Sequence, residues 1–94
     1  MLIEAQFSLY PVKEQHLAPF VDKAVEIMRS LGLEVTVGPM SSLTYGESAT
    51  IFRAFDRIIE EFGGTVRFVL ITTISNACPV GVQETGGKQG APEA

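Results

Sequence analysis

The stretch LIEAQFSLY, residues 2–10, decides the fold because apolar and polar side chains alternate along it. In an extended chain successive side chains point to opposite faces, so this alternation predicts a strand with one apolar and one polar face. The residues between the apolar ones carry a carboxylate, an amide or a hydroxyl. The apolar face is formed by Ile3, Ala5, Phe7 and Leu9.

Hydrophobic periodicity predicts five further elements after this strand. Residues 14–31 and 48–62 repeat apolar side chains every three or four positions, which is typical of amphipathic helices. Gly32 follows the first helix where a left-handed cap is expected, and Ser48 is the expected N-cap of the second. The expected strands are residues 33–37, 42–47 and 65–76.

The resulting order is strand, helix, strand, strand, helix, strand. This order predicts an α+β, ferredoxin-like βαββαβ fold, with a four-stranded antiparallel sheet and two helices on one face. Residues 1–79 are expected to form this single domain. Residues 80–94 are rich in glycine and polar residues without periodicity, so we expect a disordered C-terminal tail.

Composition limits the possible classes of function. The chain has 94 residues, a net charge of −4 and only seven Lys and Arg residues, which argues against nucleic acid as a partner. No apolar run is long enough to span a bilayer, so we expect no membrane association. The only cysteine, Cys78, and the alternating N-terminus predict a soluble protein of the reducing cytoplasm.

The face of the sheet opposite the helices is expected to mix apolar and polar side chains. Val69 and Ile71 are apolar and lie among hydroxyl-bearing residues, which predicts burial of this face against another copy in a homo-oligomer, a dimer or a tetramer. The other residues expected on this face are Glu4, Gln6, Ser8, Tyr10, Glu34, Thr36, Ser42, Thr44, Arg67, Thr73 and Ser75.

The end of the last strand, TTISNACP at residues 72–79, is unusually polar for a buried strand. One interpretation is that Thr73, Ser75 and Asn76 line a ligand pocket together with the first and third strands. The alternative is that the hydroxyls are ordinary residues of a half-buried strand, where Thr and Ser are well tolerated.

Three segments at the ends of predicted elements resemble one known family. They are FSLYP at residues 7–11, YGE at residues 45–47 and TISNACP at residues 73–79. Together they resemble the thiamine-binding protein family, which includes the YkoF-like thiamine and hydroxymethylpyrimidine binders, and the similarity covers residues 3–79. The resemblance implies a ferredoxin-like domain that associates through its sheet with a second copy. It also implies binding of thiamine or its pyrimidine precursor without catalysis, and no cofactor other than that ligand.

The resemblance further implies that Leu9, through its backbone or apolar surface, and Ser42, through its hydroxyl, contact the ligand. An aminopyrimidine needs hydroxyl, amide and backbone partners in an apolar slot, which suits both residues. The thiazolium cation of thiamine could face Tyr10 or Tyr45 and be compensated by Glu4 or Glu47. The complete set of expected ligand-binding residues is Gln6, Ser8, Leu9, Ser42, Thr44, Thr73, Ser75 and Asn76.

Two other function classes stay open. One is a sensing or regulatory domain for a different small molecule, because ferredoxin-like sheets bind many effectors. The other is a small enzyme of the acylphosphatase type, which would want an arginine in a loop after the first strand, and residues 10–16 contain none. With one histidine, His16, and one cysteine we expect no metal site and no catalytic residues.

Overall fold

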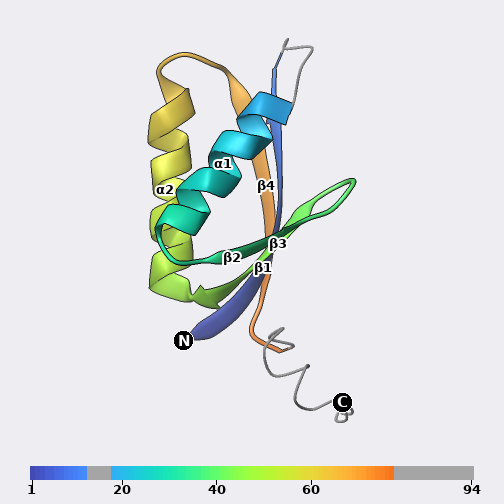
Figure 1. Ribbon diagram of the computed structural model, residues 1–94, viewed down its shortest axis with the longest axis vertical. Helices are drawn as coiled ribbons and strands as arrows, with labels where there is room; N and C mark the ends of the chain where they lie inside the picture. Colours follow the sequence, from blue (N-terminus) through green and yellow to red (C-terminus); the bar gives the residue numbers. More distant parts are fainter. Residues whose placement is uncertain (13–17, 78–94) are drawn as a thin grey trace.

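The computed structural model describes residues 1–12 and 18–77 and confirms the predicted ferredoxin-like α+β fold. Figure 1 shows both helices on one side of the sheet, and no helix of the described residues covers the other face. The predicted tail at residues 80–94, together with His16 and Cys78, lies outside the described residues. The elements are β1 (Leu2–Pro11), α1 (Ala18–Ser30), β2 (Glu34–Val37), β3 (Ser42–Glu47), α2 (Ser48–Gly63) and β4 (Phe68–Ser75).

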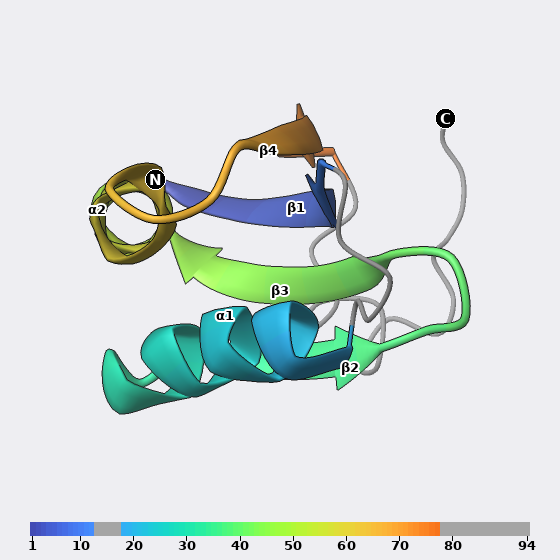
Figure 2. The same ribbon diagram turned by 90° about the horizontal axis from the view of Figure 1, so that it is seen from above.

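The sheet has the strand order β2-β3-β1-β4, and every pairing is antiparallel. Figure 2 shows β4 and β2 at opposite edges, with α1 beside β2 and β3. β1 pairs with β3 over residues 2–7 but with β4 over residues 4–11. The last residues of β1, Ser8 to Pro11, therefore have a paired strand on one side only.

The hydrophobic core fills the space between the sheet and the two helices. Phe7 of β1 meets Phe55 of α2 edge to face, with ring centroids 6.0 Å apart. Phe62 of α2 packs in the same way on Phe68 of β4 at 6.3 Å. Full burial of one such side chain contributes about 1.5–3 kcal/mol. The predicted apolar face of β1 is confirmed, because all four of its residues are buried: Ile3, Ala5, Phe7 and Leu9.

The end of α1 has the cap that the sequence predicts. Gly32 has φ +87°, a left-handed conformation that glycine adopts without steric cost. The Gly32 N–H donates to the carbonyl of Arg29 at 3.0 Å, and the Leu33 N–H donates to that of Met28 at 3.1 Å. These two bonds form a Schellman motif, and Leu33 and Met28 are both buried in the core. The motif directs the chain from α1 into β2.

The prediction that Ser48 caps α2 is wrong by one residue. Glu47 is the N-cap and makes no side-chain capping bond. Its carboxylate instead accepts from the ammonium group of Met1 at 2.9 Å, while the Ser48 N–H donates to the Met1 carbonyl at 2.9 Å. The start of α2 is thus attached to the start of β1 by an exposed ion pair and one backbone bond.

The last strand begins later than the predicted residue 65. The N–H groups of Thr65 and Val66 both donate to the carbonyl of Phe62, at 3.0 and 2.8 Å, so they complete the end of α2 instead of joining the sheet. No helix among the described residues is both long and apolar enough to cross a membrane.

The prediction that Ser42 and Thr44 lie on the open face of the sheet is wrong. In an antiparallel pair, directly opposed residues share a face. Thr44 is paired with Ala5 and Ser42 with Phe7, so both hydroxyls lie on the helix side, where they are 2% and 5% exposed. The residues that the chain places on the open face from β3 are Leu43, paired with Gln6, and Tyr45, paired with Glu4.

We predict that Gly32→Ala lowers the free energy of unfolding by about 1 kcal/mol, because the Cβ is strained at φ +87°. Gly64→Ala is the matched control, since Gly64 has φ −87° and open space around its Cα. That substitution is expected to be neutral or to stabilise by a few tenths of a kcal/mol. Urea denaturation of both variants tests the difference, and equal effects at the two positions would contradict the role of the cap.

Candidate functional site

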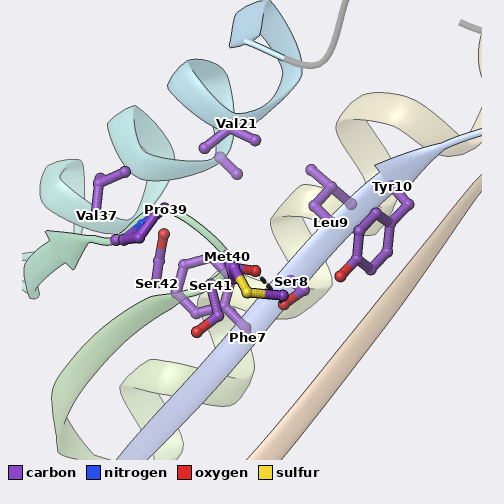
Figure 3. Close-up of a pocket in the computed structure, with 12 residues that line it drawn as sticks. Phe7, Ser8, Leu9, Tyr10, Val21, Val37, Pro39, Met40, Ser41 and Ser42 are labelled. Carbon is purple, nitrogen blue, oxygen red and sulfur yellow. Dashed lines mark hydrogen bonds between the residues drawn. The ribbon is translucent and has the colours of Figure 1, made fainter.

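A pocket of about 290 Å³ lies where β1 continues beyond its pairing with β3. Its walls come from the C-terminal half of β1, the first turns of α1 and the tip of the β2–β3 hairpin (Figure 3). Apolar side chains dominate, and hydroxyls are placed among them. The lining residues are Phe7, Ser8, Leu9, Tyr10, Val21, Ala24, Val37, Gly38, Pro39, Met40, Ser41 and Ser42.

The hairpin tip is a tight turn that forms one wall of the pocket. The Gly38 N–H donates to the carbonyl of Ser41 at 2.9 Å, and a Cβ on Gly38 would lie 2.8 Å from that carbonyl oxygen. Only glycine therefore fits at this position without a shift of the turn. Pro39 and Met40 form the tip, and Met40 is 86% exposed.

Two side chains of β1 hold this tip in place. The Ser8 hydroxyl donates to the Met40 carbonyl at 3.2 Å, and the Gln6 Nε2 donates to the Ser41 hydroxyl at 3.0 Å. The first of these bonds is drawn as a dashed line in Figure 3. Polar residues of the open face of β1 thus position the hairpin beside β1 where backbone pairing has ended.

Ser42 is the buried polar group of the pocket. Its side chain is 5% exposed, yet its hydroxyl has no hydrogen-bond partner among residues 1–12 and 18–77. Thr44, two residues further along β3, is equally buried but donates to the Glu34 carbonyl at 2.8 Å. A buried hydroxyl without a partner costs about 1–3 kcal/mol, so the Ser42 hydroxyl has the capacity to form a further hydrogen bond.

The peptide group of Leu9 is the second polar feature of the pocket. In a strand, the backbone groups of alternate residues point to the same side. The Met1 carbonyl accepts from Ser48 on the β3 side, and the Val12 N–H donates to Arg67 on the β4 side. Odd-numbered residues of β1 therefore direct their N–H and C=O toward β3. At Leu9 no β3 residue is paired, because the register ends at Phe7 and Ser42.

The pocket consequently presents a backbone donor, a backbone acceptor and a hydroxyl within apolar walls. Within the described ranges 1–12 and 18–77, no lining residue carries a carboxylate, an imidazole, an amine or a thiol. Such a site suits a flat, neutral, partly aromatic molecule that has both donors and acceptors on one edge.

The structure brings together some of the predicted site residues. Ser8, Leu9 and Ser42 line the pocket. Gln6 supports it from the open face through Ser41. Thr44 lies deeper, bonded to β2, and is not part of the lining.

The end of β4 does not reach this pocket, and a role of Thr73, Ser75 and Asn76 in ligand binding stays a prediction. The antiparallel register pairs Ser75 with Glu4 and Thr73 with Gln6, at the start of β1, whereas the pocket lies at the end of β1. Both residues are exposed on the open face. Asn76 lies beyond β4, with its Nδ2 3.8 Å from the sulfur of Met1.

The residues considered for a thiazolium cation are also separated. Tyr10 lines the pocket and is 43% exposed. Tyr45 lies at the other end of the open face, paired with Glu4 and with Glu34. Glu47 is occupied by the ammonium group of Met1.

Sequence reasoning missed the hairpin tip and the α1 wall of the pocket. The signal for the tip was present, because Gly38 and Pro39 mark a tight turn directly before the strand that carries Ser42. The contribution of Val21 was hidden, because its spacing is that of any residue on the apolar face of a helix. Within the part of the chain that the structure describes, no cluster of His, Cys, Asp or Glu could hold a metal ion.

Comparison with protein families gives one match that covers most of the chain. The family model described as thiamine-binding protein matches residues 5–77. The match includes the pocket residues of β1, α1 and the β2–β3 hairpin. A comparison with curated proteins gives no match.

Several solved structures share the fold. The hypothetical protein MJ1052 from Methanocaldococcus jannascii is 25% identical, with a TM-score of 0.73, covering 80% of this chain and 79% of that one. The putative thiamine biosynthesis/salvage protein TM0486 from Thermotoga maritima is 24% identical, with a TM-score of 0.74, covering 94% and 98%. Protein SP2199 from Streptococcus pneumoniae is 14% identical, with a TM-score of 0.74, covering 94% and 100%.

We predict that Ser42→Ala leaves the free energy of unfolding unchanged within about 0.5 kcal/mol or raises it, because the hydroxyl is buried without a partner. Thr44→Val is the matched comparison and should lower it by about 1 kcal/mol or more, because the Glu34 carbonyl loses its donor. Thermal and urea denaturation measure both. A large loss for Ser42→Ala would show that its hydroxyl serves the fold.

Proposed function

The chain belongs to the thiamine-binding protein family, and from this membership we propose that it binds thiamine or its hydroxymethylpyrimidine moiety, without catalysis, in the pocket at the end of β1. The observation that supports the proposal is the register of β1, which leaves the β3 side of Leu9, a lining residue of the pocket, without a paired strand residue. The Ser42 hydroxyl, buried and without a partner in the described structure, adds a third polar group.

The edge of a 4-aminopyrimidine has the same hydrogen-bonding pattern as the edge of a strand. A ring nitrogen accepts one hydrogen bond and the adjacent exocyclic amine donates another. The Leu9 N–H can donate to the ring nitrogen, and its C=O can accept from the amine. The pyrimidine would then take the place of the β3 residue that is missing opposite Leu9, with the Ser42 hydroxyl available to a further ring atom.

The walls of the pocket also suit this ligand. Val21, Pro39 and the Leu9 side chain offer apolar surface for the flat ring. Among residues 1–12 and 18–77, the polar side chains of the lining are hydroxyls. The relative from Thermotoga maritima, described as a putative thiamine biosynthesis/salvage protein, supports a ligand related to thiamine.

The open face of the sheet supports association with a second copy, as an extension of the proposal. Leu43, Val69 and Ile71 are 38%, 46% and 56% exposed on this face. Exposure of each such side chain forgoes about 1.5–3 kcal/mol of hydrophobic stabilisation. Face-to-face packing of two sheets would bury all three.

The charges on the open face favour an antiparallel arrangement of the two copies. Glu4 and Glu34 lie at one end of the face, and Arg67 lies at the other, beyond Val69. Stacking with the strands of the two copies reversed places each acidic end over the basic end of the partner. The second copy would also lie close to Ser8 and Tyr10, where the pocket meets the open face.

We predict that wild-type protein binds hydroxymethylpyrimidine and thiamine, and that the 4-oxo analogues, including oxythiamine, bind at least tenfold more weakly. The oxo group replaces the donor that faces the Leu9 carbonyl with an acceptor, so one buried pair becomes repulsive. Isothermal titration measures both series. Equal affinity for amino and oxo compounds would contradict pairing with the Leu9 peptide.

The Ser42→Ala variant is expected to lose about fivefold or more in affinity for the amino compounds while it stays folded, which corresponds to a hydrogen bond of about 1 kcal/mol. Thr73→Ala is the matched control, because Thr73 is an exposed hydroxyl residue outside the pocket, and its affinity should equal that of wild type. Failure of wild-type protein to bind any thiamine-related compound would favour a sensing domain for a different ligand.

We predict that Leu43→Lys weakens association through the open face and lowers the sedimentation-derived mass at micromolar concentration. A lysine at the centre of an apolar contact is costly to bury, and Leu43 is exposed enough in one chain for the fold to tolerate it. Ala49→Lys, on the exposed side of α2, adds the same charge elsewhere and should leave the mass unchanged. A wild-type protein that sediments as a monomer would contradict the assembly.

A further inference from the structure

The tip of the β2–β3 hairpin carries the most exposed large apolar side chain of the described residues. Met40 is 86% exposed, compared with 72% for Met1 and 54% for Val37. Met40 nevertheless belongs to the lining of the pocket at the end of β1. Its side chain therefore lies at the border between the apolar pocket and solvent, and the described residues leave most of it uncovered.

The position of Met40 follows from the turn at residues 38–41. The Gly38 N–H donates to the Ser41 carbonyl at 2.9 Å, which closes a turn with Pro39 and Met40 at its two central positions. The register of β1 with β3 ends where Phe7 is paired with Ser42, so its continuation would place Met40 opposite Leu9. The turn removes Met40 from that ladder. The residue that would otherwise pair with Leu9 thus lies beside the position assigned to the ligand.

The turn is attached to the rest of the domain from one side. Ser8 donates to the Met40 carbonyl at 3.2 Å, and Gln6 donates to the Ser41 hydroxyl at 3.0 Å. Both donors belong to the open face of β1. The wall that α1 forms lies across the pocket, with Val21 and Met40 on different sides of it (Figure 3). Among residues 1–12 and 18–77 no hydrogen bond joins the turn to α1, so no hydrogen bond fixes the distance between them.

Methionine suits a contact that forms only when a ligand is present. Its unbranched side chain has three rotatable bonds and adapts to irregular apolar surfaces, and its thioether sulfur makes favourable contacts with aromatic rings. Val21 and Ala24 of α1 can cover one face of a flat ring in the pocket. The other face needs cover from the hairpin, where Met40 is the long and flexible apolar side chain.

We propose that the turn at residues 38–41 is a lid, and that Met40 determines specificity for an aromatic ligand by closing over the ring face that α1 leaves open. This role rests on the proposed function, because the ring is the thiamine-related pyrimidine bound at Leu9. In the free protein Met40 is exposed to solvent. In the complex its thioether covers the ring and excludes water from the Leu9 peptide group, where hydrogen bonds become stronger in apolar surroundings.

Methyl NMR of the full chain tests the contact, because the chain has only three methionines. Met28 is buried in the core, whereas Met1 and Met40 are exposed. In the free protein we expect a soluble paramagnetic agent to broaden the Met40 methyl signal strongly. Saturating hydroxymethylpyrimidine should shift this signal through the ring current and reduce its broadening, while the Met28 signal stays in place. The spectrum of Met40→Leu assigns the signal.

Substitution of Met40 measures its effect on affinity. We expect Met40→Ala to bind hydroxymethylpyrimidine and thiamine about fivefold or more weakly, because the ring loses its apolar cover. Met40→Leu keeps an apolar side chain and should lose less. Ile59→Ala is the matched control, because Ile59 is also an exposed large apolar residue, at 48%, but lies on α2 outside the pocket lining. Its affinity should equal that of wild type, and circular dichroism should show that all three variants are folded.

The combined results separate the lid from the pocket itself. If wild type binds the ligand, Met40→Ala binds it equally well and the Met40 methyl signal does not shift, the lid is overturned and the proposed function stands. Weaker binding by Met40→Ala with an unshifted signal also overturns the lid, because the substitution then acts through the turn. Weak paramagnetic broadening of Met40 in the free protein would show that it is covered before the ligand binds, with the same consequence. Failure of wild type to bind any thiamine-related compound overturns the proposed function and the lid together.

Discussion

The unequal pairing of β1 is the constraint on which the rest of the structure depends. β1 lies between β3 and β4, and its register with β3 ends at Phe7 while its register with β4 continues to Pro11. From Ser8 onward the β3 side of the strand has no ladder. The chain fills this gap with a hairpin tip held by side chains, and a pocket is left where backbone pairing would otherwise continue.

The alternation of side chains between the two faces of the sheet explains why some hydroxyls are buried and others are not. Ser42 and Thr44 share the helix-facing side with Phe7 and Ala5, so they enter the core together with the apolar residues. Thr44 satisfies its hydroxyl on the neighbouring strand, but Ser42 stands at the end of the ladder, where no backbone carbonyl of the described residues accepts from it. Because Ser42 lies where the β1–β3 register ends, its hydroxyl is buried and still free to form a hydrogen bond within the described residues.

The local architecture was predictable from the sequence, because each element has a strong local signal. The alternation around Phe7, the bounds of β3 and the left-handed Gly32 cap all follow from periodicity and backbone sterics. What failed was the relation between strands. The alternation of faces along β3 is shifted by one residue from the prediction, so Ser42 and Thr44 lie on the helix side. The antiparallel register also places the polar end of β4 beside the start of β1, away from the pocket.

A backbone contact at Leu9 could be expected only from the resemblance to the family, and the reason is physical. Two of the polar groups that distinguish the pocket belong to the Leu9 backbone, and a peptide group is present at every residue whatever its side chain. Its capacity to bind depends on the absence of a paired strand, which is a property of the register and not of residue identity. A side-chain motif such as FSLYP can therefore indicate where the Leu9 peptide group lies, but its side chains do not determine whether that peptide group is unpaired. If the proposed contact holds, the side chains of the pocket can vary as long as the β1–β3 ladder ends at the same point.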